Sequence, residues 1–156
     1  MGPRQGLTII DTNVFVIDLR YRRDKNFDIN REFLENMSKS GLGVITLTNL
    51  LELCGILSFN LNGQELTELF FHFSRRYKIC VVPTPQIKQY LPTVRVEDIL
   101  KIISLKTSLG DVLFIGMIKN CLPLAMTIIS WNKEHLTGRI DSEIVSPKDF
   151  FKMKRR

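Results

Sequence analysis

The sequence has few cysteines, and they do not form a recognisable framework. Its three cysteines in 156 residues are Cys54, Cys80 and Cys121, and each lies within an apolar run. Their odd number and wide spacing argue against both a disulfide framework and a zinc knuckle. We therefore expect three core cysteines in a reducing compartment.

Long apolar runs and low-complexity segments are also absent. No apolar run reaches the length of a membrane span, and residues 1–6 do not begin a signal peptide. Glycine and proline number only 9 and 6, while 44% of the residues are hydrophobic, which is enough for a sizeable core. The sequence therefore predicts one soluble, cytoplasmic domain over residues 1–156, without a membrane partner.

Negative charge is in deficit. The sequence has 22 Lys and Arg against 16 Asp and Glu, a formal charge of +6 that favours a polyanionic partner without requiring one. Basic residues cluster at 20–23, 75–78 and 152–156. Taken singly, each cluster is explained better by a solvated surface than by contact with phosphate.

Four short apolar runs predict strands that are buried on both faces of a parallel sheet. Helical stripes lie between the runs, and two sets of capping residues predict helix starts. The alternation predicts a three-layer α/β/α fold with a mostly parallel sheet of four to five strands. The strands are Leu7–Ile10, Val44–Leu47, Ile79–Val82 and Met126–Ile129; the stripes are Leu66, Leu69, Phe70, Phe73 and Val96, Ile99, Leu100, Ile103; the caps are Asn62 with Glu65, and Ser146, Pro147 and Asp149.

Three acids stand alone in apolar sequence. Asp11 ends the first predicted strand, Glu52 opens the helix after the second, and Asp111 opens a late helix. Asn132 follows the fourth strand, so all four residues are expected at the carboxyl ends of the strands, where open parallel sheets bind ligands. We expect Glu52 to lie in a helix that is apolar on almost every side. A buried, unpaired carboxylate is costly, so a compensating group is expected.

Each residue also has a purely structural interpretation. Asp11 suits an N-cap or a turn, Asp111 would complement the positive end of its helix, and Asn132 suits a turn. Taken together, three carboxylates at one sheet edge would repel each other unless a cation neutralised them. All-oxygen ligation without a His or Cys cluster favours Mg²⁺ or Mn²⁺ over zinc. Such a cation is suited to phosphodiester hydrolysis.

Taken in order, these segments resemble the motifs of the PIN-domain family, especially its VapC-like toxin nucleases. The matching segments cover nearly the whole chain and read IIDTNVFV, VITLTNLLELCGIL, SLGDVLFIGMIKN, IISWNKEHL and IVSPKDFF. The resemblance implies a PIN-like, or Rossmann-like, fold in which Asp11, Glu52 and Asp111 are the catalytic, metal-binding acids. Asn13 matches the polar residue that supports the first acid.

Asn132 departs from the family's commoner pattern, in which a fourth acid stands at this position, and matches a variant with Asn and a following His. Asn132 has no charge, so it would be a weaker metal ligand, through its carbonyl oxygen or through water. Glu134 could compensate from the same loop. His135 could contact the phosphate backbone, although a surface role explains a lone loop histidine better.

The resemblance also implies an activity and partners. The activity is metal-dependent endonucleolytic cleavage of RNA with Mg²⁺ or Mn²⁺ as cofactor, and basic side chains would follow the RNA backbone. The family's toxins are held inactive by an antitoxin protein and frequently form homodimers, so the resemblance implies both partners, and neither can be read from the residues themselves. Leucines and phenylalanines of residues 57–73 could form such a surface, but core packing explains them better.

Two other functions are alternatives. A haloacid-dehalogenase-like phosphatase also uses a strand-end Asp, Mg²⁺ and a later Gly-Asp, but its second Asp is replaced here by Asn13, and residues 112–118 contain no acid. An RNA-binding or scaffold PIN domain with weakened catalysis would explain Asn132. It would not explain why three costly carboxylates are present.

Overall fold

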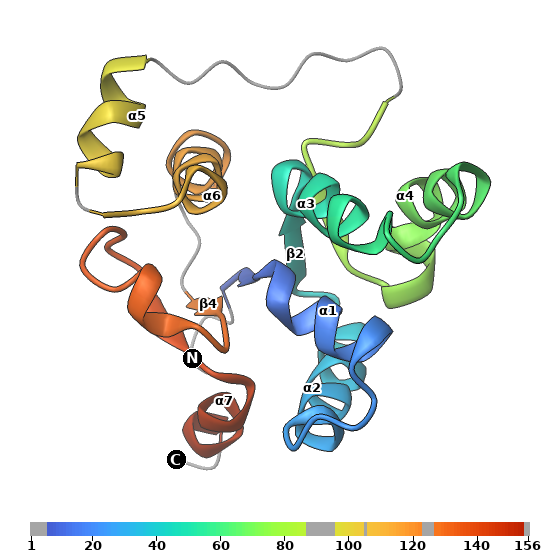
Figure 1. Ribbon diagram of the computed structural model, residues 1–156. Coiled ribbons are helices and arrows are strands. Elements are labelled where there is room, and N and C mark those ends of the chain that lie inside the picture. Colours follow the sequence, from blue (N-terminus) through green and yellow to red (C-terminus); the bar gives the residue numbers. More distant parts are fainter. Residues whose placement is uncertain (1–5, 87–95, 105, 123–126, 155–156) are drawn as a thin grey trace.

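A five-stranded parallel sheet forms the centre of the structure (Figure 1). The computed structural model describes residues 6–86, 96–104, 106–122 and 127–154. The strands follow the order β3-β2-β1-β4-β5, and they are β1 Thr8–Ile10, β2 Gly43–Thr46, β3 Cys80–Val82, β4 Thr127–Ile129 and β5 Glu143–Val145. The predicted α/β fold with a mostly parallel sheet is confirmed. The predicted start of the fourth strand, Met126, and the last two residues of the basic cluster 152–156 lie outside the described residues.

Helices alternate with these strands and cover the sheet. Alternate residues of each strand face different hydrophobic clusters, as the period of a strand requires. Ile10, Ile45 and Ile129 pack with α1, α2, α4 and α7, whereas Ile9, Val44 and Ile128 pack with α6 and with Ile102 of α5. The sheet is therefore the middle of three layers. The helices are α1 Thr12–Arg20, α2 Phe27–Ser40, α3 Leu47–Leu57, α4 Gly63–Tyr77, α5 Val96–Ile103, α6 Leu109–Cys121 and α7 Pro147–Lys154, with a short 3₁₀ helix η1 at Lys133–His135.

The capping predictions agree with the structure. Asn62 and Glu65 form a reciprocal capping box at the start of α4. The hydroxyl of Ser146 accepts a hydrogen bond from the backbone N–H of Asp149, and Pro147 is the first residue of α7. Both helices therefore begin where the sequence indicates.

One predicted helix forms with its apolar stripe facing outward, and one burial prediction is wrong. The helix is α5, in which Val96 and Leu100 are exposed to 70% and 60%. Ile102 makes the contact with the core instead, because α5 is apolar on more than one side. Cys80 is exposed, since β3 is an edge strand, while the other two cysteines are partly buried and all three are free thiols. No helix in the described ranges is both long enough and apolar enough to cross a membrane.

Gly43 lies where the sheet packs closely against Ile79 and Ile10 of the cluster that includes α1, α2, α4 and α7. A Cβ at this position would lie 2.9 Å from Cγ1 of Ile79 and 3.4 Å from Cδ1 of Ile10. We predict that Gly43→Ala lowers the free energy of unfolding by about 1–3 kcal/mol, measured by urea titration. Gly55→Ala is the matched control, because among the described residues no atom lies within 4 Å of its Cβ position. It should gain up to about 1 kcal/mol from helix propensity. Equal stability of Gly43→Ala and the parent would contradict the close approach.

Candidate functional site

The order of the strands reverses beside β1. The chain passes from β1 through β2 to β3 on one side, while β4 and β5 lie on the other side. The crevice outside the carboxyl ends of strands at such a switch point is the usual ligand site of an open parallel sheet. Asp11 follows β1 there, and its backbone N–H donates to the carbonyl of Ile129 at the end of β4 over 2.9 Å.

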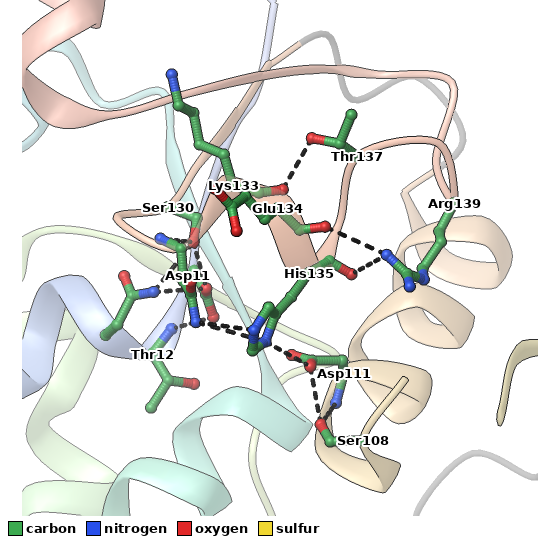
Figure 2. A network of polar contacts seen from close by, with 12 residues as sticks. Asp11, Thr12, Ser108, Asp111, Ser130, Lys133, Glu134, His135, Thr137 and Arg139 are labelled. Atoms are coloured by element: carbon green, nitrogen blue, oxygen red, sulfur yellow. Dashed lines mark hydrogen bonds and ion pairs between the residues drawn. The ribbon is translucent and has the colours of Figure 1, made fainter. Parts of the chain in front are cut away.

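The carboxylate of Asp11 accepts hydrogen bonds from four groups. Its Oδ1 accepts from the backbone N–H of Thr12 at 2.7 Å and from Nδ2 of Asn49 at 3.3 Å. Its Oδ2 accepts from Oγ of Ser130 at 2.7 Å and from Nδ2 of Asn13 at 3.0 Å. Thr12 and Ser130 are seen on either side of Asp11 in Figure 2. Asp11 is therefore the N-cap of α1, and of the three acids in the crevice its carboxylate accepts the most hydrogen bonds.

Burial governs the ionisation of Asp11. Desolvation is the largest of the causes that raise the pKa of Asp11 from 3.8 to about 6. The hydrogen bonds from Ser130 and Thr12 oppose this rise, and the nearby carboxylates of Glu52 and Asp111 add to it. Near neutral pH the carboxylate is ionised at a cost in free energy that a nearby cation would relieve.

Glu52 is exposed, so the prediction of a carboxylate enclosed by apolar groups is wrong. Its helix presents this side chain to the crevice, where Oε2 accepts a hydrogen bond of 2.5 Å from the hydroxyl of Thr12. Its Oε1 lies only 3.0 Å from the place that a Cβ would take at Gly110. Glycine at the start of α6 therefore leaves room for the carboxylate of Glu52.

Asp111 lies in the first turn of α6, opposite η1. Ser108, the N-cap of α6, donates its hydroxyl to Oδ2 of Asp111 at 2.8 Å and accepts from the backbone N–H of Asp111 at 3.2 Å. Nδ1 of His135 lies 3.4 Å from the same carboxylate oxygen, and Figure 2 shows the imidazole directed at it. Nδ2 of Asn132 lies 3.4 Å from the imidazole. The η1 turn is therefore in contact with α6 across the crevice.

One hollow of about 320 Å³ collects most of the predicted site residues. Glu134 is not among the described residues that line it, and its backbone carbonyl accepts a hydrogen bond from Arg139. The structure thus brings the three acids together with Asn13, Asn132 and His135, and leaves Glu134 outside. The lining residues are Asp11, Thr12, Asn13, Val16, Glu52, Ile56, Ser108, Asp111, Asn132 and His135.

Sequence reasoning missed Thr12, Asn49 and Ser130, which all contact the acids. Asn49 precedes Glu52 by three residues, so both lie on one face of α3. Ser130 directly follows β4, as Asp11 follows β1. Position after a strand could have identified Ser130, but no local pattern distinguishes Asn49 from an ordinary helix residue.

The donor set is chemically suited to a hard cation, because its carboxylate, amide and hydroxyl oxygens are the ligands of Mg²⁺ and Mn²⁺. As the side chains lie, no three His, Cys, Asp or Glu within the described ranges are placed to hold one ion. Glu52 is turned to Thr12, and Asp111 is turned to Ser108. A cation would therefore require these two carboxylates to rotate toward Asp11.

No protein-family model and no curated protein matches the chain. Solved structures do match. A chain in the crystal structure of FitAcB from Neisseria gonorrhoeae has a TM-score of 0.56 at 14% identity, with 91% of this chain and 99% of that chain covered. A chain in the structure of FitAB bound to IR36 DNA fragment has a TM-score of 0.53 at 13% identity, with 90% and 95% covered. At these identities the likeness establishes the fold, which is PIN-like.

The raised pKa of Asp11 predicts a pH dependence of stability in the presence of chelator. The folded-state pKa of about 6 exceeds the unfolded value of 3.8, so the stabilisation is full below pH 4 and is lost as the pH rises through 6. At about 1.4 kcal/mol per pH unit, the loss is about 3 kcal/mol. Asp11→Asn has no carboxyl group at this position and should not lose this stability. The difference in free energy of unfolding, variant minus parent, should therefore rise by about 3 kcal/mol between pH 4 and pH 7. Asp141→Asn, an exposed control, should show no such trend. If the difference in free energy of unfolding between Asp11→Asn and the parent did not change with pH, the pKa of Asp11 would not be raised by burial.

Proposed function

We propose that this chain is a metal-dependent endoribonuclease of the PIN type, which hydrolyses RNA phosphodiester bonds with Mg²⁺ or Mn²⁺. The observation that carries the proposal is the convergence of Asp11, Glu52 and Asp111 on one hollow at the switch point of a PIN-like sheet. These acids come from three separate segments, and their mutual repulsion opposes folding unless a cation offsets it. The order of motifs in the sequence supports the same conclusion.

The three acids would have different roles. Asp11 is the fixed ligand, because four donors hold its carboxylate in place. A cation would have to displace one of these donors, and Asn49, at 3.3 Å, is the most weakly bound. Glu52 and Asp111 would complete the coordination or orient the attacking water. When bound, the metal would supply a more acidic water and neutralise charge on the phosphate.

The η1 turn would contact the substrate. Asn132 lines the hollow and could add a neutral oxygen ligand. His135 is exposed and lies against Asp111. Once Asp111 turned toward a metal, the imidazole would be left beside the bound phosphate. This arrangement supports a phosphate contact for His135.

Two basic clusters that are distant in sequence meet on one surface. Five basic side chains against two acidic ones line a hollow of about 440 Å³ that combines both clusters. The helix α1 leads from Asp11 toward this surface and ends at Arg20, which is about 12 Å along the helix axis from Thr12. This supports an RNA strand that runs along α1. The charged residues of the hollow are Arg22, Arg31, Lys39, Arg76 and Lys78, with Asp18 and Glu35.

We further propose that the chain is the toxin of a toxin–antitoxin pair and forms a homodimer. The resemblance to VapC-like toxins and the structural likeness to FitAB chains support an antitoxin partner. The exposed apolar side chains of Val96, Leu100, Ile103 and Leu109 offer a surface for a second copy. The leucines and phenylalanines of residues 57–73 contribute mainly to the core, although Phe59 and Phe71 are 85% and 39% exposed.

An RNA-binding or scaffold domain is the second candidate. It is favoured by the neutral Asn132 and by the absence, in the described ranges, of three acids already placed around one point. A haloacid-dehalogenase-like phosphatase is less well supported. Asn13, at the position of that family's second acid, donates a hydrogen bond to Asp11 and cannot act as an acid.

The decisive experiment is cleavage of a mixed pool of single-stranded and structured RNA with Mg²⁺, with Mn²⁺ and with chelator. The parent should cut only with metal. Asp11→Asn, Glu52→Gln and Asp111→Asn should each lower the rate of cleavage by a factor of about 100 or more. Asp141→Asn is the matched control and should cut like the parent. Full activity of all three acid variants would exclude the proposed site. If the parent is folded and binds RNA but cuts it with neither metal, the RNA-binding or scaffold function is favoured. If it instead releases phosphate from a small monoester in a metal-dependent reaction, the phosphatase is favoured.

The proposed RNA path predicts the salt dependence of binding. We expect Arg22→Gln and Arg76→Gln to weaken binding of single-stranded RNA by Asp11→Asn protein. Each should reduce the slope of log K against log salt by about 0.7, because one phosphate contact is lost. Lys119→Gln, at the other end of α6 from Asp111, is the control. Unchanged slopes for both arginine variants would place the RNA elsewhere on the surface.

A further inference from the structure

Asn30 occupies a core position in α2. The buried residues of this helix are Asn30, Phe33, Leu34 and Met37, which form one apolar stripe apart from the asparagine, and Asn30 is 0% exposed. A buried amide is costly unless its hydrogen bonds are satisfied, and an aliphatic side chain would fill the position without that cost. Asn30 therefore needs an explanation beyond packing.

The amide of Asn30 joins three segments of the chain. Its Nδ2 donates to the carbonyl of Val14 in α1 over 2.8 Å. Its Oδ1 accepts a hydrogen bond of 2.7 Å from Nε1 of Trp131, in the turn after β4. The side chain thus connects α2 to α1 and to the segment that enters the crevice.

Trp131 is held at both ends and lies between two residues of the site. Its indole is bound to Asn30, and its backbone N–H donates to Oδ1 of Asn13 at 3.2 Å. On one side, Ser130 donates to Asp11. On the other side, the backbone N–H of Asn132 donates to the hydroxyl of Ser130 over 3.0 Å. Placement of the indole therefore sets the placement of this turn.

We infer that Asn30 is a positioning residue, which fixes the indole of Trp131 and thereby holds the turn 130–135 against the acid-lined hollow. Asn30 does not line the hollow. It acts through Trp131, so loss of either partner should loosen the same turn. The inference rests on the proposed function only where it concerns metal affinity. Its effect on the turn itself is independent of any metal or RNA.

The metal-free test is hydrogen exchange of the backbone amides, followed by mass spectrometry in chelator. Asn30→Ala should speed exchange in residues 130–136 about tenfold, as expected for loss of the one hydrogen bond that joins Asn30 to this turn, while the rest of α2 and the sheet keep their protection. Trp131→Phe removes the same hydrogen bond from the other partner and should give the same local pattern. Asn30→Ala in the Trp131→Phe background should not speed exchange in residues 130–136 any further, because the two residues act on this turn as one unit.

Met37→Val is the matched control, since it alters the same buried stripe without a hydrogen bond to the turn. Met37→Val should raise exchange throughout the chain and not in one turn. If Asn30→Ala gives this same pattern, or leaves exchange in residues 130–136 unchanged, Asn30 is only a core residue and the inference is wrong. Should Asn30→Ala fail to fold, the pattern seen with Trp131→Phe decides, because Trp131 is only partly buried and phenylalanine keeps an aromatic ring there.

A second measurement addresses the metal. Trp131 is the only tryptophan, so its emission reports on this turn, and a change with Mn²⁺ that Asp11→Asn abolishes would show binding without any cleavage assay. Calorimetry should then give about tenfold weaker Mn²⁺ binding for Asn30→Ala, with no further loss in the double variant. Equal Mn²⁺ affinity would overturn the link from Asn30 to the metal. A parent that binds no Mn²⁺ would count against the proposed function, and the exchange experiment would still decide the role of Asn30.

Discussion

Desolvation of the partly buried Asp11 carboxylate is the constraint around which the crevice is arranged. An ionised carboxylate that is largely removed from water must be compensated by donors or by a cation. The donors come from the first turn of α1, from α3 and from the end of β4. Because these three elements are separate in the chain, the hydrogen bonds that satisfy one side chain also fix the relative positions of the elements. The network is thus part of the fold and part of the site.

The other two acids are held differently. Glu52 lies beside the start of α6, and Asp111 lies in its first turn, where the helix dipole and the free N–H groups favour negative charge. Both carboxylates are reached by solvent, and each is held by a hydroxyl group. They can therefore rotate at little cost, whereas Asp11 cannot. The hollow therefore combines one rigid carboxylate with two adjustable ones, and under the proposed function this would allow the coordination of a metal to change as a phosphate enters and leaves.

Much of the fold could be predicted because its signals are local. Continuous apolar runs identified four of the five strands, and the capping residues Asn62 and Ser146 marked two helix starts. The fifth strand, β5, was not among these runs, because it is three residues long and begins with a charged residue. The candidate acids were found because Asp11, Glu52 and Asp111 are isolated charges. Tertiary packing decided the rest. The exposed strip of α3 that carries Glu52 is too narrow to appear in a periodic pattern, and α5 is apolar on more than one side. The bond between Asn30 and Trp131 joins residues 101 positions apart, so no local pattern encodes it.

The environment of Asp11 also affects how the protein should be crystallised. With a pKa of about 6, the side chain would be largely protonated in the acidic precipitants that often yield crystals. A proton on Oδ1 or Oδ2 would compete with an ion soaked into the lattice. Crystals intended for metal soaking should therefore be grown or transferred to pH 7 or above, where occupancy would report affinity instead of protonation.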